Sequence, residues 1–333
     1  MPQALKNLTF GALTNLHSIR WLAAGNAALL LVITIAGATT PEPHLPGPAV
    51  HARQEPITPI PQPPPADPLK LALGERLFAD KILSRDRSRA CSSCHDIHTN
   101  GADHNRRDRA IDGSELPLRT LTVFNAAVSF RLNWEGNFRT LETQAESALR
   151  HTAGLAASLD DALKELKAHP TIAYQFDEAY GHAPDRASFL DAIATYERSL
   201  VTPGSRFDRC LQGDAKALSA EEQRGYQLFK SLGCVSCHQG VNVGGNLFER
   251  HGIFHPLGSL QPEILRVPSL RNVAMMAPYF HDGSAATLDE AVRKMAFAQL
   301  DDTLTDRQVD AIVAFLRTLT GSYRGALVTA APP

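Results

Sequence analysis

Cys91-Ser92-Ser93-Cys94-His95 and Cys234-Val235-Ser236-Cys237-His238 are two copies of the pattern C-x-x-C-H, and they decide the fold. This pattern attaches a c-type haem, because its two thiols form thioethers with the haem and its histidine supplies the proximal iron ligand. A zinc site would need ligands from both copies, and a redox C-x-x-C does not require the histidine. We therefore expect two covalently bound haem c groups, attached at Cys91, Cys94, Cys234 and Cys237, with His95 and His238 as iron ligands.

The surroundings of the two motifs also match. Apolar spacing predicts a helix over residues 68–79, just before the first motif, and it contains Gly74-x-x-Leu77-Phe78. A second helix opens on the capping box at residues 219–222 and contains Gly225-x-x-Leu228-Phe229. The chain thus repeats one unit, which predicts a mostly α protein of two tandem cytochrome c-like helical domains, each carrying one haem. Pro203 and Gly204 place the boundary between residues 68–203 and 204–321.

Further helices are predicted from apolar periodicity and capping signals. In the first domain they cover residues 159–167, 172–180 and 187–200. In the second domain, Thr287-x-x-Glu290 caps a helix that carries Met295. Thr305-x-x-Gln308 caps a last amphipathic helix that ends at Gly321, and we expect residues 322–333 to form a frayed tail.

The remaining sequence indicates export. Residues 1–40 carry basic residues, an apolar run and a small-x-small site, which predicts a signal peptide or an N-terminal membrane anchor. Half of the 22 prolines lie between residues 41 and 68, so residues 41–67 are predicted to be a linker without a core. The net charge of −2 gives no indication of nucleic-acid binding. Both N-terminal alternatives place the haem domains in the periplasm, either soluble or anchored to the inner membrane.

Over residues 68–321 the sequence resembles the bacterial di-haem cytochrome c peroxidases and the related MauG-like di-haem oxidases. The resemblance rests on both C-x-x-C-H motifs, on residues 237–245, on Leu270-Arg271-Asn272 and on Ala277-Pro278-Tyr279-Phe280-His281-Asp282-Gly283. It implies a peroxidase that reduces hydrogen peroxide to water with electrons from a small donor, a cytochrome c or a cupredoxin. Homodimers are usual in this family.

The resemblance also implies roles for individual residues. The N-terminal haem would bind peroxide, and the C-terminal haem would be a high-potential electron store with Met295 as its second axial ligand. A thioether ligand raises the reduction potential, although a methionine on an apolar helix is more often a core residue. The MauG-like branch has a tyrosine at this position, so Met295 favours the peroxidases. Trp134 would relay electrons between the haems, and Gln144 would lie in the peroxide pocket.

Three departures from the family pattern concern the peroxide site and a metal site. The position of the family's catalytic glutamate falls on Gly154, which leaves His151 as a candidate base. The family's distal histidine aligns with Ile111 or Asp112, so the N-terminal haem is either open or closed by another histidine, His98 or His104. The resemblance also implies calcium between the domains, but the family's asparagine ligand aligns with Arg119, and only the backbone near Met276 and Pro278 remains to contribute.

Two alternatives stay open beside the peroxidase. A MauG-like oxidase would use stored oxidising equivalents on a protein side chain, and the missing glutamate favours it. A non-enzymatic di-haem electron carrier would need both irons six-coordinate, so the ligand opposite His95 separates it from the enzymes.

Overall fold

The computed structural model describes residues 55–332 apart from residues 104, 152–153 and 259–260. The predicted signal peptide or anchor and most of the proline-rich segment therefore lie outside the described residues, as does His104. Among the helices that are described, none combines the length and apolar character needed to cross a membrane.

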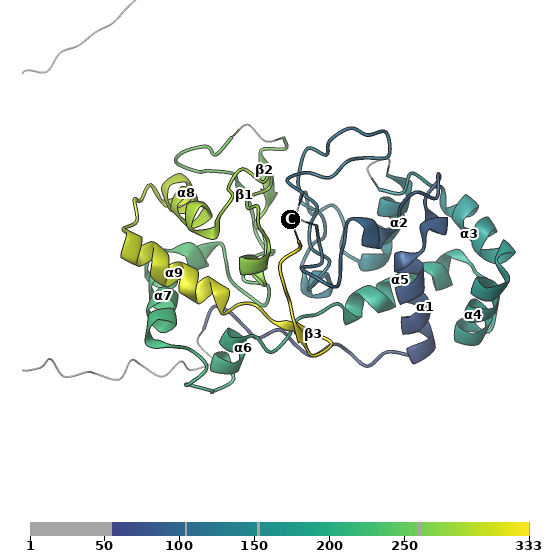
Figure 1. Cartoon of the computed structure of the whole chain (residues 1–333), viewed down its shortest axis with the longest axis horizontal. Coiled ribbons are helices and arrows are strands. Elements are labelled where there is room, and N and C mark those ends of the chain that lie inside the picture. Colours follow the sequence, from purple (N-terminus) through teal and green to yellow (C-terminus); the bar gives the residue numbers. More distant parts are fainter. Residues whose placement is uncertain (1–54, 104, 152–153, 259–260, 333) are drawn as a thin grey trace, which may run out of the picture. The chain divides into compact units, whose positions relative to one another are not determined.

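The described residues are mostly helical, as predicted, and form two domains of similar plan (Figure 1). The first contains α1 (Pro68–Ala79), α2 (Leu141–Arg150), α3 (Leu159–Ala168), α4 (Pro170–Tyr180) and α5 (Arg186–Ser199). The second contains α6 (Arg206–Leu211), α7 (Ala220–Ser231), α8 (Leu288–Leu300) and α9 (Asp306–Arg317). Short antiparallel pairs join β1 (Phe248–Arg250) to β2 (Ile264–Arg266) and β3 (Ser322–Tyr323) to β4 (Ala326–Leu327). The sequence did not predict α2, whose buried residues are Leu141, Glu146 and Leu149.

One pair of crossing helices supports each haem motif. In the first domain α1 packs on α5, and in the second α7 packs on α9. A Cβ atom at Gly74 would lie 2.1 Å from the carbonyl oxygen of Ala192, and one at Gly225 would lie 1.9 Å from that of Ala311. The repeated glycine therefore lets two helix backbones touch at the same place in both domains.

The segment before α1 differs from its predicted role as a linker without a core. Ile57 is 1% exposed and belongs to the core of the second domain, where it pairs with Gly240 as an isolated β-bridge. Glu55 accepts hydrogen bonds from Tyr226 and Lys230. The prediction is wrong for residues 55–60, because Ile57 and Ile60 are buried, whereas residues 61–67 are exposed and form no helix or strand.

The prediction of a frayed tail after Gly321 is also wrong. The β3–β4 hairpin turns the chain back, and Arg324 donates two hydrogen bonds of 2.8 Å to the carboxylate of Glu75 on α1. Val328 is 3% exposed and packs with Phe78 in the first domain. The end of the described chain therefore fastens the second domain to the first.

Candidate haem sites and the cavity between them

Both C-x-x-C-H motifs open onto one cavity of about 740 Å³. Its lining combines apolar side chains of both domains with a few polar groups, as is typical of cofactor pockets. It includes all the site residues that the sequence predicts, namely Cys91, Cys94, His95, Trp134, Gln144, Cys234, Cys237, His238 and Met295. The fold thus brings these residues together, and the individual roles remain predictions.

The two motifs share one backbone conformation. Each begins with a single 3₁₀ turn, η2 (Cys91–Ser93) or η4 (Cys234–Ser236). The N–H of His95 donates to the carbonyl of Cys91 at 3.0 Å, and that of His238 donates to the carbonyl of Cys234 at 3.0 Å. Burial raises the pKa of Cys91 to about 12 and that of Cys234 to about 11. Zinc binding is not supported, because the part of the chain that the structure describes has no group of three or more His, Cys, Asp or Glu side chains placed to hold a metal ion.

The two proximal histidines are oriented by backbone carbonyls. Nδ1 of His95 lies 3.4 Å from the carbonyl oxygen of Gly101, and Nδ1 of His238 lies 3.2 Å from that of Val243. Burial lowers the pKa of both imidazoles, that of His238 to about 4. An imidazole that is neutral and donates from Nδ1 keeps the lone pair of Nε2 for a metal. The residues present therefore fit two c-type haems.

A loop and helix that follow each motif form a second repeat, which the sequence analysis missed. The loops close with the bridges Leu132–Phe138 and Tyr279–Ala285, and Thr140 and Thr287 then cap α2 and α8. The signal was present as L-N-W-E-G at residues 132–136 and Y-F-H-D-G at residues 279–283. In this repeat Trp134 corresponds to His281, and Ala148 corresponds to Met295, each the eighth residue of its helix.

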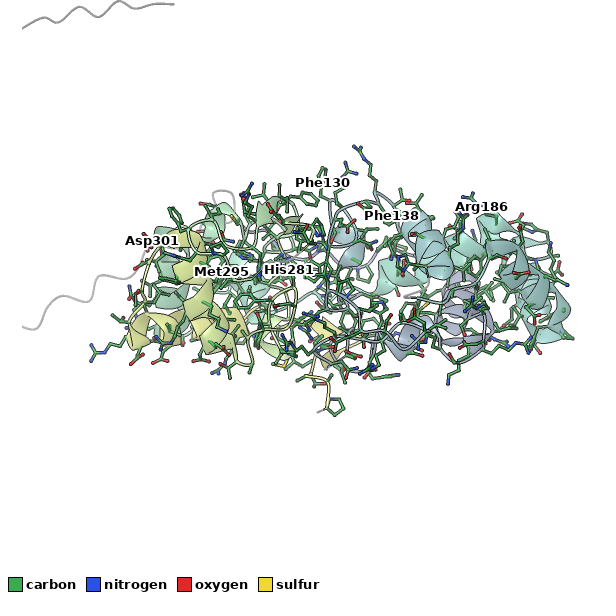
Figure 2. All side chains as sticks on the ribbon, turned by 90° about the horizontal axis from the view of Figure 1, so that it is seen from above. Phe130, Phe138, Arg186, His281, Met295 and Asp301 are labelled. Carbon is green, nitrogen blue, oxygen red and sulfur yellow. The ribbon has the colours of Figure 1, made fainter. Side chains whose placement is uncertain are left out.

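Trp134 and His281 also contact each other. Their ring centroids are 4.4 Å apart in an edge-to-face arrangement, with Met295 further along the second domain (Figure 2). The indole Nε1 donates to the carbonyl of Arg119 at 2.8 Å, and Nε2 of His281 lies 3.1 Å from the carbonyl of Arg266. The indole is therefore held where the equivalent loops of the two domains meet.

Two further side chains in the cavity suit the carboxylates of a haem. Arg266 is 6% exposed and donates from Nε to the carbonyl of Asn133 at 3.0 Å, and burial lowers its pKa to about 10. Burial is the sole cause of that pKa shift, and no charged group of the described residues contributes to it. Both ring nitrogens of buried His251 are without a hydrogen-bond partner in the same part of the chain. Groups of this kind suit the propionates of a haem, because buried cations and N–H groups bind carboxylates strongly. Sequence patterns alone gave no signal for them.

The cavity wall near the first motif explains one departure from the family pattern. A Cβ atom at Gly154 would lie 2.4 Å from the carbonyl oxygen of Ala148, so this backbone leaves no room for a glutamate there. Gln144 lines the wall and donates from Nε2 to the side chain of Asn133 at 3.3 Å. His151, which ends α2, also lines it.

Neither Ile111 nor Asp112, the positions aligned with the family's distal histidine, lines the cavity. His98 is exposed on the surface, where its backbone N–H donates to the carboxylate of Asp96 at 3.0 Å. Of the two histidines proposed to close the first haem, His98 is therefore placed away from the cavity, and His104 lies outside the described residues.

Glu197 on α5 is a buried acid that the sequence analysis did not single out. It lines the cavity, is 8% exposed, and has one carboxylate oxygen without a hydrogen-bond partner in the described structure. Burial, with a contribution from the charge of Glu142, raises its pKa to about 8. The acid therefore carries a proton at neutral pH.

The residues at the predicted calcium position do not fit a calcium ion. The Arg119 guanidinium donates to the carbonyl oxygens of Met276, at 2.9 Å, and Pro278. Calcium needs six to eight oxygen ligands at about 2.3–2.6 Å, and a buried guanidinium on the same oxygens excludes it.

Comparisons with known proteins agree with this arrangement. The family model for di-haem cytochrome c peroxidase matches residues 68–216, and the model for cytochrome c matches residues 222–320. The chain is 38% identical to the cytochrome c peroxidase Ccp of Escherichia coli K12 over 81% of its own length, but it spans only 62% of that relative. It is 35% identical to the cytochrome c551 peroxidase of Nitrosomonas europaea, covering 85% of this chain and 90% of the relative.

Among solved structures, a MauG-like protein associated with microbial copper homeostasis has a similar fold. The TM-score is 0.67 with 26% identity, covering 85% of this chain and 96% of that protein.

Proposed function

Since the chain belongs to the bacterial di-haem cytochrome c peroxidase family and is an enzyme of that family, we propose that it reduces hydrogen peroxide to water with electrons from a small periplasmic protein. The donor would be a cytochrome c or a cupredoxin. A c-type haem is attached after export, which supports the periplasmic location. The observation that carries the proposal is the single cavity that both haem motifs line.

We assign peroxide binding to the haem at His95. The repeat supports this assignment. Ala148 occupies the position that is equivalent to Met295, and the methyl group of an alanine cannot ligate iron. Haem iron with an open position supplies the chemistry of peroxide cleavage. Gln144 would orient the peroxide by hydrogen bonding, and His151 at the end of α2 would accept and return its proton.

We assign the electron store to the haem at His238, with Met295 as its second ligand. A methionine thioether opposite a histidine raises the reduction potential, as in cytochromes c. Trp134 would pass electrons from this haem to the first, since its ring lies where the two domains meet.

Electron entry near α8 is supported by exposed apolar side chains. Ile253, Phe254 and Phe297 are 51%, 58% and 47% exposed, and the backbone N–H of Phe254 donates to the carbonyl of Ala298 on α8. A small apolar area suits the brief encounters of redox proteins.

The family resemblance also implies a homodimer, which sedimentation of the holoprotein would test.

The second candidate is a MauG-like oxidation of a protein side chain. Gly154 favours it, because the family's glutamate has no counterpart at that position. The third candidate, a di-haem electron carrier, requires a sixth ligand opposite His95, and Ala148 and the surface position of His98 weigh against it.

Electron paramagnetic resonance and optical spectra of the oxidised holoprotein, before and after hydrogen peroxide, test the proposal. We expect a high-spin ferric signal that peroxide abolishes, followed by peroxide turnover with a reduced cytochrome. Peroxide consumption without donor oxidation would favour the MauG-like oxidase. Two low-spin signals that peroxide does not change, even after half-reduction of the protein, would contradict both enzyme proposals and support the electron carrier.

A further inference from the structure

Three backbone carbonyls from two loops, one in each domain, converge on the guanidinium of Arg119. Nη1 donates to Met276 at 2.9 Å and also to Pro278, and Nη2 lies 3.5 Å from the carbonyl oxygen of Asp103. Asp103 belongs to the first domain and the other two residues to the second. Carbonyl oxygens turned toward one point form a site for a cation, because each directs its negative end inward.

Two carboxylates near Arg119 stabilise its positive charge, whereas its burial acts against that charge. The side chain is 8% exposed, and its burial lowers the pKa of the guanidinium, while the charges of Asp103 and Asp108 oppose that shift. Its stem lies so close to Gly283 that a Cβ atom there would be 3.3 Å from Cδ of Arg119. The cation is therefore built into the packing of the fold.

The backbone of the same residue holds the two rings at the domain contact. The Arg119 carbonyl accepts the indole N–H of Trp134 at 2.8 Å, and the Arg119 N–H donates to the carbonyl of His281 at 2.8 Å. A shift of Arg119 would therefore move both members of the Trp134–His281 pair. Arg119 is a positioning residue, since it reaches them through hydrogen bonds of its own backbone.

We propose that the Arg119 guanidinium is an internal cation that replaces a divalent metal between the domains, so that the placement of Trp134 needs no calcium. An arginine fixed to the chain cannot be removed by a chelator, whereas a bound ion can. The inference concerns metal dependence and does not rest on which substrate the enzyme reduces.

The test compares the wild-type holoprotein with Arg119→Asn, which removes the cation and adds an amide oxygen. Each protein is treated with EGTA and then with calcium or, as a control, magnesium at the same ionic strength. Thermal unfolding is followed by circular dichroism, and calcium binding by calorimetry. Arg307→Asn, on the exposed side of α9, is the matched control, and Arg119→Lys restores a positive charge.

We expect wild type, Arg307→Asn and Arg119→Lys to unfold at the same temperature with EGTA or calcium. Arg119→Asn should unfold at least about 4 °C lower in EGTA, because buried carbonyls lose their partner, and calcium should reverse the loss where magnesium does not. A role in packing alone would not produce that rescue. Stoichiometric calcium binding by wild type, or a fall in its unfolding temperature in EGTA, would overturn the proposal even if Arg119→Asn failed to fold. So would an Arg119→Asn variant that calcium does not change.

Discussion

The two haem domains share a framework and differ at positions that line the cavity between them. Both bring a helix pair together at a glycine, both fold C-x-x-C-H as one 3₁₀ turn, and both follow it with a bridged loop and a capped helix. Asn125 and Asn272, each in the left-handed conformation, hydrogen-bond from both sides to the hydroxyl of Thr202. The symmetry therefore extends to the junction between the domains.

Three pairs of equivalent residues break this symmetry within the cavity. In the repeat, Ala148 is equivalent to Met295, and Trp134 is equivalent to His281. Glu197 is equivalent to Leu316, because each lies five residues after the residue whose carbonyl contacts the helix glycine, Ala192 or Ala311. The first domain thus has an alanine in place of the proposed methionine ligand, has the indole that we propose as relay, and has a protonated acid. Changes of single side chains at equivalent positions therefore give the two copies of one framework different haem environments.

The largest effect should come from giving the first domain the ligand of the second. In Ala148→Met the new sulfur would close the position at which we propose that peroxide binds. A ligand favoured by about 2.8 kcal/mol leaves about 1% of the sites open, so peroxidase turnover should fall about a hundredfold. The high-spin ferric signal should disappear with it.

Two variants sharpen that comparison. Ala148→Leu adds similar bulk without a ligand, so it should keep the high-spin signal. Met295→Ala should instead turn the second haem high-spin and leave the response of the first to peroxide in place. Full turnover and an unchanged high-spin signal in Ala148→Met would show that α2 does not face the sixth position.

A smaller effect is expected at the aromatic pair. Trp134→Phe keeps a ring against His281 but removes the N–H that Arg119 accepts and the indole that we propose as relay. Turnover at saturating donor should fall about tenfold, or 1.4 kcal/mol in the activation free energy, while the peroxide-induced spectral change persists. Stopped-flow re-reduction of the first haem measures this step.

Phe130→Leu is the control for that experiment, because Phe130 lies on the same loop with 63% of its surface exposed (Figure 2). It should leave the rate unchanged. Equal rates in wild type and Trp134→Phe would remove the indole from the electron path.

The sequence predicted the parts of this site that covalent chemistry or capping specifies. C-x-x-C-H predicted both haem attachments, and Thr287 predicted the start of the helix that carries Met295. Contacts between segments far apart in the sequence were not predictable, which is why the docking of Ile57 and Val328 was missed. The same holds for Arg266 and Glu197, because nothing local distinguishes them from surface charges.

The smallest effect concerns Glu197, and it depends on pH. Folding raises the pKa of this acid from 4.5 to about 8. Between these two pH values the folded protein keeps a proton that the unfolded chain has already released. Its stability should therefore fall as the pH rises from about 5 to about 8. Leu316 imposes no such dependence on the second domain.

Glu197→Gln keeps the shape and cannot ionise, so its stability relative to wild type should rise over that range by at least about 1 kcal/mol. This is less than the full pKa shift would give, because water that enters the cavity reduces the cost of the charge. Guanidinium unfolding at pH 5, 7 and 9 measures the difference, and Glu135→Gln, at an exposed position, is the control. A difference that stays constant from pH 5 to 9 would mean that Glu197 is already ionised at pH 5 in the folded protein, and the two haem environments would then not differ by a proton on this acid.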